Sequence, residues 1–109
     1  MTQLIPLHSQ TIDGNAVETV SARELHEFLE SKQDFSTWIK NRIEQYDFVE
    51  NQDYTLFHKK MEQVSGAKHL IEYYITLDMA KELSMVERTD KGKQARKYFI
   101  ECEKQLNAQ

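Results

Sequence analysis

The segment richest in chemically active side chains runs from residue 88 to residue 97. It holds one acid and five basic residues, Arg88, Lys91, Lys93, Arg96 and Lys97, in a chain whose net charge is −4. If Asp90 caps the helix that follows, Lys91 and Lys93 lie in its first turn, where each positive charge opposes the helix dipole by about 0.3–1 kcal/mol. A placement that costs stability favours binding of an anion or an acidic partner. Screening of exposed lysines by salt is the alternative explanation.

Two further groups of residues are candidate contacts. Helix-turn-helix proteins read bases with side chains near the start of their second helix, and hydroxyl, amide and ammonium groups suit base edges. The side chains of this kind after Asp34 are Ser36, Thr37, Lys40 and Asn41, whereas Phe35 and Trp38 are expected in the core. Lys59 and Lys60 form a second basic spot on a predicted hairpin, with either a partner or solvent around them.

Catalytic and metal-binding patterns are missing from the sequence. The three glycines are isolated, and no stretch matches G-x-x-x-x-G-K-[ST] or G-x-G-x-x-G. His58 and His69 flank the predicted hairpin and could approach each other across it, but a zinc site needs four N or S ligands, or three plus water. Cys102 lies between Phe99 and Leu106 on an apolar stripe, which favours core packing over a nucleophilic role. We therefore expect no catalytic residue, no metal and no cofactor, and the chain is not expected to be an enzyme.

The N-terminal half is predicted to form a hairpin and a pair of helices. Residues 1–20 predict a β-hairpin, with Asp13-Gly14 suited to its tight turn. Ser21 to Glu24 fits a capping box and begins a helix that is expected to end near Ser31. A second helix begins near Asp34, with apolar residues three or four apart. Two short helices joined by a tight turn resemble a helix-turn-helix.

The second half is predicted to form a wing and two helices. The strand-forming runs 53–58 and 70–76 predict a β-hairpin, with a loop signal at Ser65-Gly66 between them. Thr76 or Asp78 caps the next helix, and Asp90 caps the last, whose apolar stripe is Ala95, Tyr98, Phe99, Cys102 and Leu106. The expected fold class is α+β: one small domain over 1–109, with the N-terminal hairpin (1–20) and a helical and wing core (21–106).

Chain length, hydropathy, cysteine count and net charge limit the expected cell compartment and the expected class of partner. A chain of 109 residues suits one domain. No apolar window approaches the length of a membrane helix, the N-terminus lacks the pattern of a signal peptide, and one cysteine cannot form an internal disulfide. The expected location is the cytoplasm, with no membrane contact. The net charge of −4 counts against simple DNA binding, because Lys and Arg supply most nonspecific affinity for the phosphates.

The stretch from Val20 to Lys104 resembles the AntA/AntB antirepressor domain of bacteriophages and prophages. The matching segments are VSARELHEFL, FSTWIKNRIEQYDFVENQDY and YYITLDMAKELSMVERTDKGKQARKYFIECEK. The family is related to the KilA-N and BRO-N domains, some of which are thought to bind DNA. The resemblance implies a protein that binds a phage repressor, or covers its DNA-binding surface, in the bacterial host and so relieves repression of lytic genes. Many relatives continue into a second domain, so the chain is expected to be either a short standalone version or an excised domain.

Three functions remain open at the level of sequence. The first is an antirepressor, whose negative net charge suits contact with the basic, DNA-facing side of a repressor. The second is a DNA-binding regulator of winged-helix type that uses the basic segment on phosphates. The third is a structural subunit or an inhibitor of other host machinery. For a phage regulator, a homo-oligomer, most simply a dimer, is also expected.

Overall fold

A tight β-hairpin forms the first part of the fold. In the computed structural model, which describes residues 4–61 and 68–108, strand β1 (Leu7–Ile12) pairs antiparallel with β2 (Asn15–Ser21). Between them, Asp13 and Gly14 have φ values of 52° and 79°. Positive φ at both central residues is what a type I′ turn requires. The predicted hairpin is confirmed, although its first strand begins only at Leu7.

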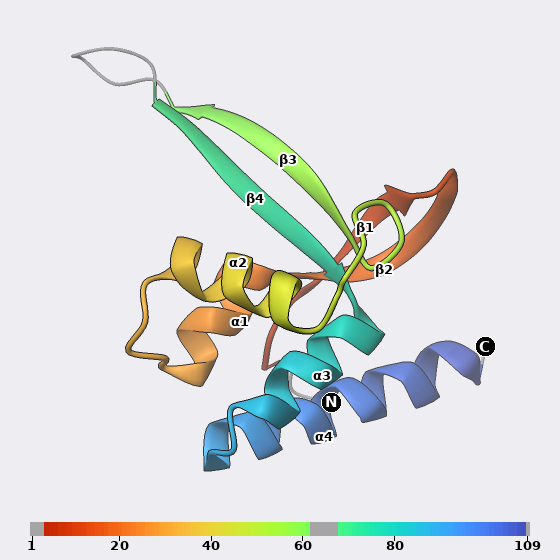
Figure 1. Ribbon diagram of the computed structural model, residues 1–109. Coiled ribbons are helices and arrows are strands. Elements are labelled where there is room, and N and C mark those ends of the chain that lie inside the picture. Colours follow the sequence, from red (N-terminus) through yellow and green to blue (C-terminus); the bar gives the residue numbers. More distant parts are fainter. Residues whose placement is uncertain (1–3, 62–67, 109) are drawn as a thin grey trace.

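The predicted wing is the second hairpin, and it joins the first in one sheet. Strand β3 (Tyr54–Met61) pairs antiparallel with β4 (Lys68–Thr76), and both are longer than the sequence indicated. The loop predicted at Ser65-Gly66 lies outside the described residues. The strand order is β1-β2-β4-β3, with Val20 of β2 opposite Ile75 of β4. The outer part of the wing extends beyond the helices (Figure 1).

Four helices within the described ranges complete the α+β fold, and each begins at a side-chain cap. They are α1 (Ala22–Leu29), α2 (Phe35–Gln45), α3 (Leu77–Val86) and α4 (Asp90–Asn107). The side-chain oxygen of each cap accepts a hydrogen bond from the backbone N–H three residues further on. The caps are Ser21, Asp34, Thr76 and Thr89. Such caps satisfy donors that have no partner within the helix.

Three local expectations need correction. Asp90 is the first residue of α4 and not its cap, because the Thr89 hydroxyl accepts from Gly92 N at 3.0 Å. The capping box of α1 is only half formed: Ser21 Oγ accepts from Glu24 N, but the Glu24 carboxylate lies 2.7 Å from His8 Nε2. Helix α1 ends at Leu29 instead of near Ser31, since Glu30 turns the chain with φ of 55°.

Strands β2 and β4 run into helices without a linker. Ser21 is the last residue of β2 and the cap of α1, and Thr76 is the last residue of β4 and the cap of α3. The two strand ends lie side by side, because Ser21 pairs with Tyr74 and Thr19 pairs with Thr76. The sheet therefore fixes where both helices begin.

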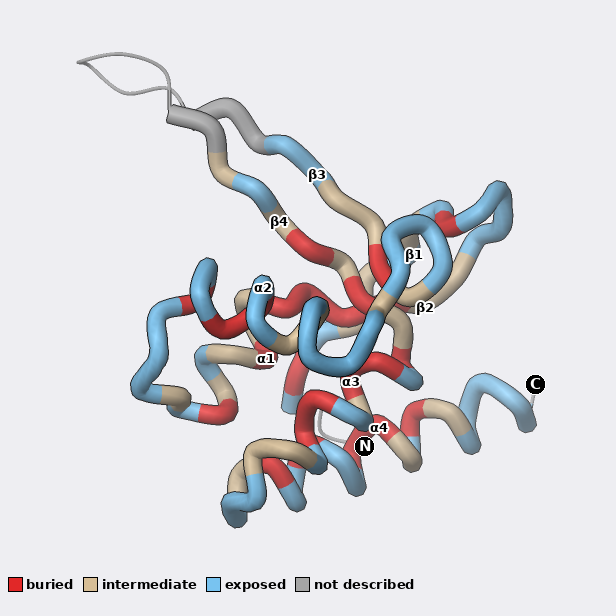
Figure 2. The backbone as a smooth tube through the Cα atoms, viewed as in Figure 1, coloured by how far each residue is buried: buried red, intermediate tan, exposed pale blue. Residues whose placement is uncertain are grey.

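The core lies between the base of the sheet and the helices (Figure 2). Its most enclosed side chains include Trp38, Phe99, Leu25, Ile75 and Leu83, all 0% exposed. The Tyr98 hydroxyl donates to the Ile5 carbonyl at 2.7 Å, which ties the chain before β1 to α4. Leu106 was predicted on the apolar stripe of α4, but it is 37% exposed, so the buried stripe ends at Cys102. No helix within the described ranges is long and apolar enough to cross a membrane.

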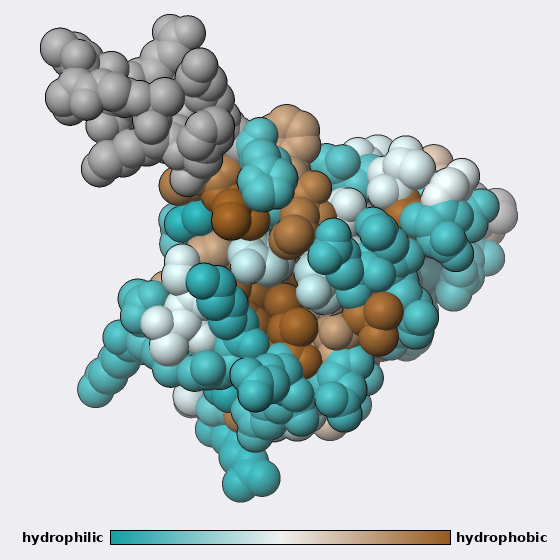
Figure 3. Space-filling model, turned by 45° about the horizontal axis from the view of Figure 1, so that its top comes forward, coloured by the Kyte–Doolittle hydropathy of each residue, from teal (hydrophilic) through white to brown (hydrophobic). Residues whose placement is uncertain are grey.

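Apolar side chains also reach the surface at the base of the wing (Figure 3). Phe57 of β3 is 52% exposed and Ile71 of β4 is 38% exposed. Residues 57 and 71 are not opposite each other in the register, since Phe57 pairs with Glu72 and His58 with Ile71. Because directly opposite residues share one face of a sheet, these two side chains lie on opposite faces of the wing.

The thiol of Cys102 is predicted to be inert in the native protein. Its residue is 3% exposed, and burial raises the pKa of the thiol, which lowers the reactive thiolate fraction. Burial also raises the pKa of the neighbouring Tyr98 to about 12. We expect a thiol reagent to label Cys102 only at the rate of unfolding, with full labelling in denaturant as the control. Labelling of the native protein as fast as a free thiol would contradict this core position.

Candidate functional site

The turn between α3 and α4 is a tight connection. Arg88 has φ of 54°, the left-handed conformation that turns the chain at the end of α3. Its N–H donates to the Met85 carbonyl at 3.3 Å, and Thr89 then caps α4. Gly92 lies against α3 so closely that a Cβ atom there would be 2.4 Å from the Ser84 carbonyl oxygen. Glycine at this position therefore allows the two helices to approach each other.

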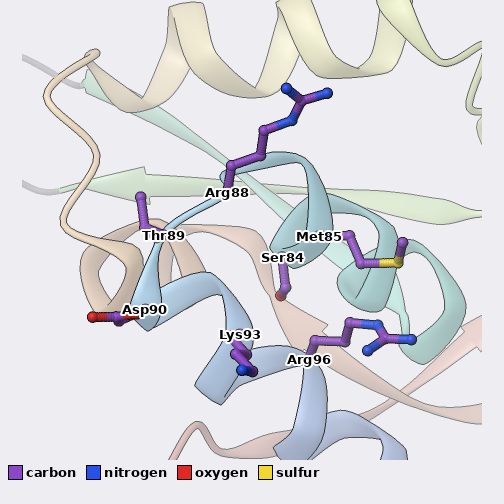
Figure 4. Close-up of a pocket in the computed structure, with 7 residues that line it drawn as sticks. All are labelled: Ser84, Met85, Arg88, Thr89, Asp90, Lys93 and Arg96. Atoms are coloured by element: carbon purple, nitrogen blue, oxygen red, sulfur yellow. The ribbon is translucent and has the colours of Figure 1, made fainter.

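An open groove of about 520 Å³ lies at this turn (Figure 4). Its lining residues come from the end of α3, the turn and the first two turns of α4; they are Ser84, Met85, Arg88, Thr89, Asp90, Lys93 and Arg96. Met85 and Arg96 extend in the same direction, and Arg88 extends towards α2. Met85 is 54% exposed, so the groove combines an apolar side chain with three cations and one carboxylate.

The structure divides the five basic residues predicted as one cluster. Arg88, Lys93 and Arg96 line the groove. Lys91 is directed towards α1, with its Nζ 4.9 Å from the centre of the Phe28 ring, a cation–π contact. Lys97 is exposed on α4 but does not line the groove. Because Asp90 is the first residue of α4, its carboxylate favours the helix dipole that Lys91 opposes.

Glu87 is the residue next to the groove that sequence reasoning missed. Its Oε1 accepts from Trp38 Nε1 at 2.8 Å and from Arg42 Nη2 at 3.2 Å. The Glu87 side chain is only 11% exposed. The sequence around Glu87 contains no pattern that indicates a contact with α2, so this interaction could not be predicted from the sequence. Glu87 fixes the α3–α4 turn, and with it Arg88, to the second helix.

The second group of candidates lies on the outer side of α2. Ser36, Thr37, Lys40 and Asn41 are all exposed, whereas Phe35 and Trp38 are buried as predicted. The N–H and hydroxyl groups of Thr37 donate to the Asp34 carboxylate and hold its pKa below the usual value. Asn41 lines a shallow polar hollow of about 420 Å³, together with Gln33, Arg42, Glu44 and Gln45.

The wing residues are not brought to the groove. Lys59 and Lys60 belong to β3 and pair with Leu70 and His69, and contacts of their side chains lie outside what the structure describes. This part of the wing extends away from the α3–α4 turn (Figure 1). His58 pairs with Ile71 and His69 with Lys60, so the two histidines are diagonal neighbours on one face of the hairpin and not a directly opposite pair. Over residues 4–61 and 68–108, no three His, Cys, Asp or Glu side chains form a group that could hold a metal.

The structure defines a small α+β domain with an open, charged groove at a helix–helix turn. A comparison with known families matches residues 20–89 to the AntA/AntB antirepressor family. The match spans more than half of the chain, and the chain belongs to this family, which is a regulatory, non-enzymatic kind of protein. Arg88 lies within the matched region, whereas Lys93 and Arg96 lie beyond its end. Neither the curated proteins nor the solved structures gave a match.

Proposed function

We propose that this domain is a phage antirepressor that binds a transcriptional repressor in the cytoplasm of the bacterial host and so relieves repression of lytic genes. The observation that carries the proposal is membership of the AntA/AntB antirepressor family over residues 20–89. The family implies interaction with a repressor in general terms, and the groove supplies a candidate contact surface.

The groove suits a protein contact because its cations are not used inside the domain. The five ion pairs of the described residues employ His8, Arg23, Arg42 and Lys81, and none employs Arg88, Lys93 or Arg96. Arginine and methionine are among the residues enriched at protein interfaces. We propose that Arg88, Lys93 and Arg96 hold the repressor at this turn.

Direct DNA binding is the second candidate. The observation that favours it is the exposure of Ser36, Lys40 and Asn41 on α2, which follows α1 after a short turn. The net charge of −4 opposes it. This opposing charge makes repressor binding the stronger proposal.

The two functions are separated by fluorescence anisotropy of a labelled operator duplex. The duplex is measured alone and after saturation with the repressor encoded nearest to this gene, while the domain is titrated in. We expect anisotropy to fall from the repressor-bound value to that of free duplex, with no rise on duplex alone. A rise on free duplex that weakens steeply with salt would support DNA binding instead.

Two variants assign the surface in the same titration. The groove variant Arg88→Gln/Lys93→Gln/Arg96→Gln keeps polar side chains and removes three charges. It is expected to raise the concentration needed to displace the repressor by about 100-fold or more. The α2 variant Ser36→Ala/Lys40→Ala/Asn41→Ala is expected to displace the repressor like the wild type. Loss in the α2 variant with retention in the groove variant would move the contact surface to α2.

A further inference from the structure

The charge of the groove differs in sign from that of the whole chain. Three cations and one carboxylate line it, in a protein whose net charge is −4. Within the described part of the chain, Arg23, Arg42 and Lys81 are each paired with an acid, and the groove cations are not. The complementary surface on a partner is therefore acidic.

The exposed thioether of Met85 distinguishes between two kinds of acidic partner. Met85 is 54% exposed among the groove cations. A nucleic-acid backbone offers phosphates and sugars, which gain little from a flexible apolar side chain, and the Asp90 carboxylate, which also lines the groove, repels phosphate. A protein segment with an apolar side chain between acidic ones uses both features, because methionine adapts its shape to an apolar contact.

We infer that the groove docks an acidic segment of the repressor that carries an apolar side chain and lies away from the repressor's DNA-binding face. The inference rests on the proposed function. A DNA-binding face is basic, because it neutralises phosphates, so it does not complement Arg88, Lys93 and Arg96. The net charge of the chain had favoured contact with that basic face, and the local charge of the groove favours the opposite one.

This location has a kinetic consequence. A contact away from the DNA leaves the operator-bound repressor accessible, so the domain joins the complex before the repressor departs. The rate at which the repressor leaves the operator then depends on the concentration of the domain. A domain that only captured free repressor through its DNA-binding face would leave that rate unchanged.

The test measures the dissociation rate of repressor from labelled operator after addition of excess unlabelled operator. We expect the rate to rise with domain concentration and to level off at about fivefold or more, the low end for coupling between two sites on one protein. The groove variant Arg88→Gln/Lys93→Gln/Arg96→Gln should leave the rate unchanged. The control Lys32→Gln/Lys104→Gln, which removes two exposed lysines outside the groove, should act like the wild type.

The apolar part of the contact has its own variant. Met85→Gln keeps the length of the side chain but makes it polar, and it is expected to raise the concentration needed for half of the rate increase by about tenfold. An unchanged concentration dependence for Met85→Gln, or loss of the rate increase in the lysine control, would overturn the docking of an acidic, apolar segment.

The remaining outcomes separate this inference from the proposed function. If the repressor is displaced at equilibrium but its dissociation rate is independent of the domain, the contact is at the DNA-binding face and the inference is wrong, while the antirepressor function stands. If the domain does not bind free repressor by titration calorimetry, the proposed function fails. If it binds the duplex alone through the groove cations, the ligand is nucleic acid and both are overturned.

Discussion

Replacement of Gly92 with alanine is expected to destabilise the domain by about 3 kcal/mol, the upper part of the usual range for overpacking. In an exposed helix the same change stabilises by about 1 kcal/mol, so the expected sign is reversed. The reason is that the new Cβ would lie 2.4 Å from the Ser84 carbonyl oxygen and 3.2 Å from Glu87 Cβ. Backbone atoms cannot rotate away, so α3 and α4 must separate. Thermal unfolding should show a melting temperature lower by roughly 15 °C for a domain of this size.

The control for Gly92 is Gln94→Ala, two residues further along α4. Gln94 is exposed, and substitution there should change stability by less than about 0.5 kcal/mol. An unchanged or higher melting temperature for Gly92→Ala would show that the two helices can separate at no cost. The groove would then not depend on their close approach.

Loss of Glu87 is expected to be the second large effect. Glu87→Ala removes the acceptor of Trp38 Nε1 and the charge that faces Arg42, and it should cost about 3 kcal/mol, the low end for breaking a buried ion pair by removing one partner. Arg42 would keep only a hydrogen bond from Nη1 to Gln45 Oε1 at 3.3 Å, and its buried Nε has no hydrogen-bond partner among the described residues. Denaturant unfolding monitored by the fluorescence of Trp38, the single tryptophan, measures the loss directly.

Two comparisons give the Glu87 result its meaning. Glu87→Gln keeps an oxygen for Trp38 and removes only the charge, so its loss of stability should be smaller than that of Glu87→Ala. Glu103→Gln breaks the more exposed pair with Lys81, whose side chains are 25% and 29% exposed, and should cost less than about 1 kcal/mol. Equal losses for Glu87→Ala and Glu103→Gln would show that burial at the α3–α4 turn contributes nothing to the pair.

The elements of the fold were predictable where the signals are local. Asp13-Gly14 specifies its own turn, and Ser21, Asp34 and Thr76 specify helix starts by accepting hydrogen bonds from N–H groups three residues away. The position of the α4 cap was missed by one residue, because Thr89 and Asp90 are both suitable caps and only the folded turn decides between them. The joining of the two hairpins in one sheet was not predicted, since the pairing of Val20 with Ile75 links distant segments through ordinary strand residues.

The candidate site was predictable in its charge but not in its geometry. The density of Lys and Arg after residue 87 is visible in the sequence. The division of that cluster depends on the helical angle of each residue and on the ring of Phe28, which engages Lys91 from another helix. The roles of Glu87 and Met85 depend on burial and exposure, which the sequence around them does not indicate.

The direct passage from strands into helices bears on the entropy of binding. Because Ser21 and Thr76 serve both as strand ends and as helix caps, the backbone has no linker residue there that could act as a hinge. The helices are therefore preorganised relative to the sheet, and α4 follows α3 through a turn held by Thr89 and Gly92. Docking of a partner at this turn immobilises long side chains, at an entropic cost of about 0.5–1.5 kcal/mol each, but it orders little of the backbone of this domain. Because the backbone of the domain is already ordered, affinity depends mainly on how well the docking segment of the partner is ordered before it binds.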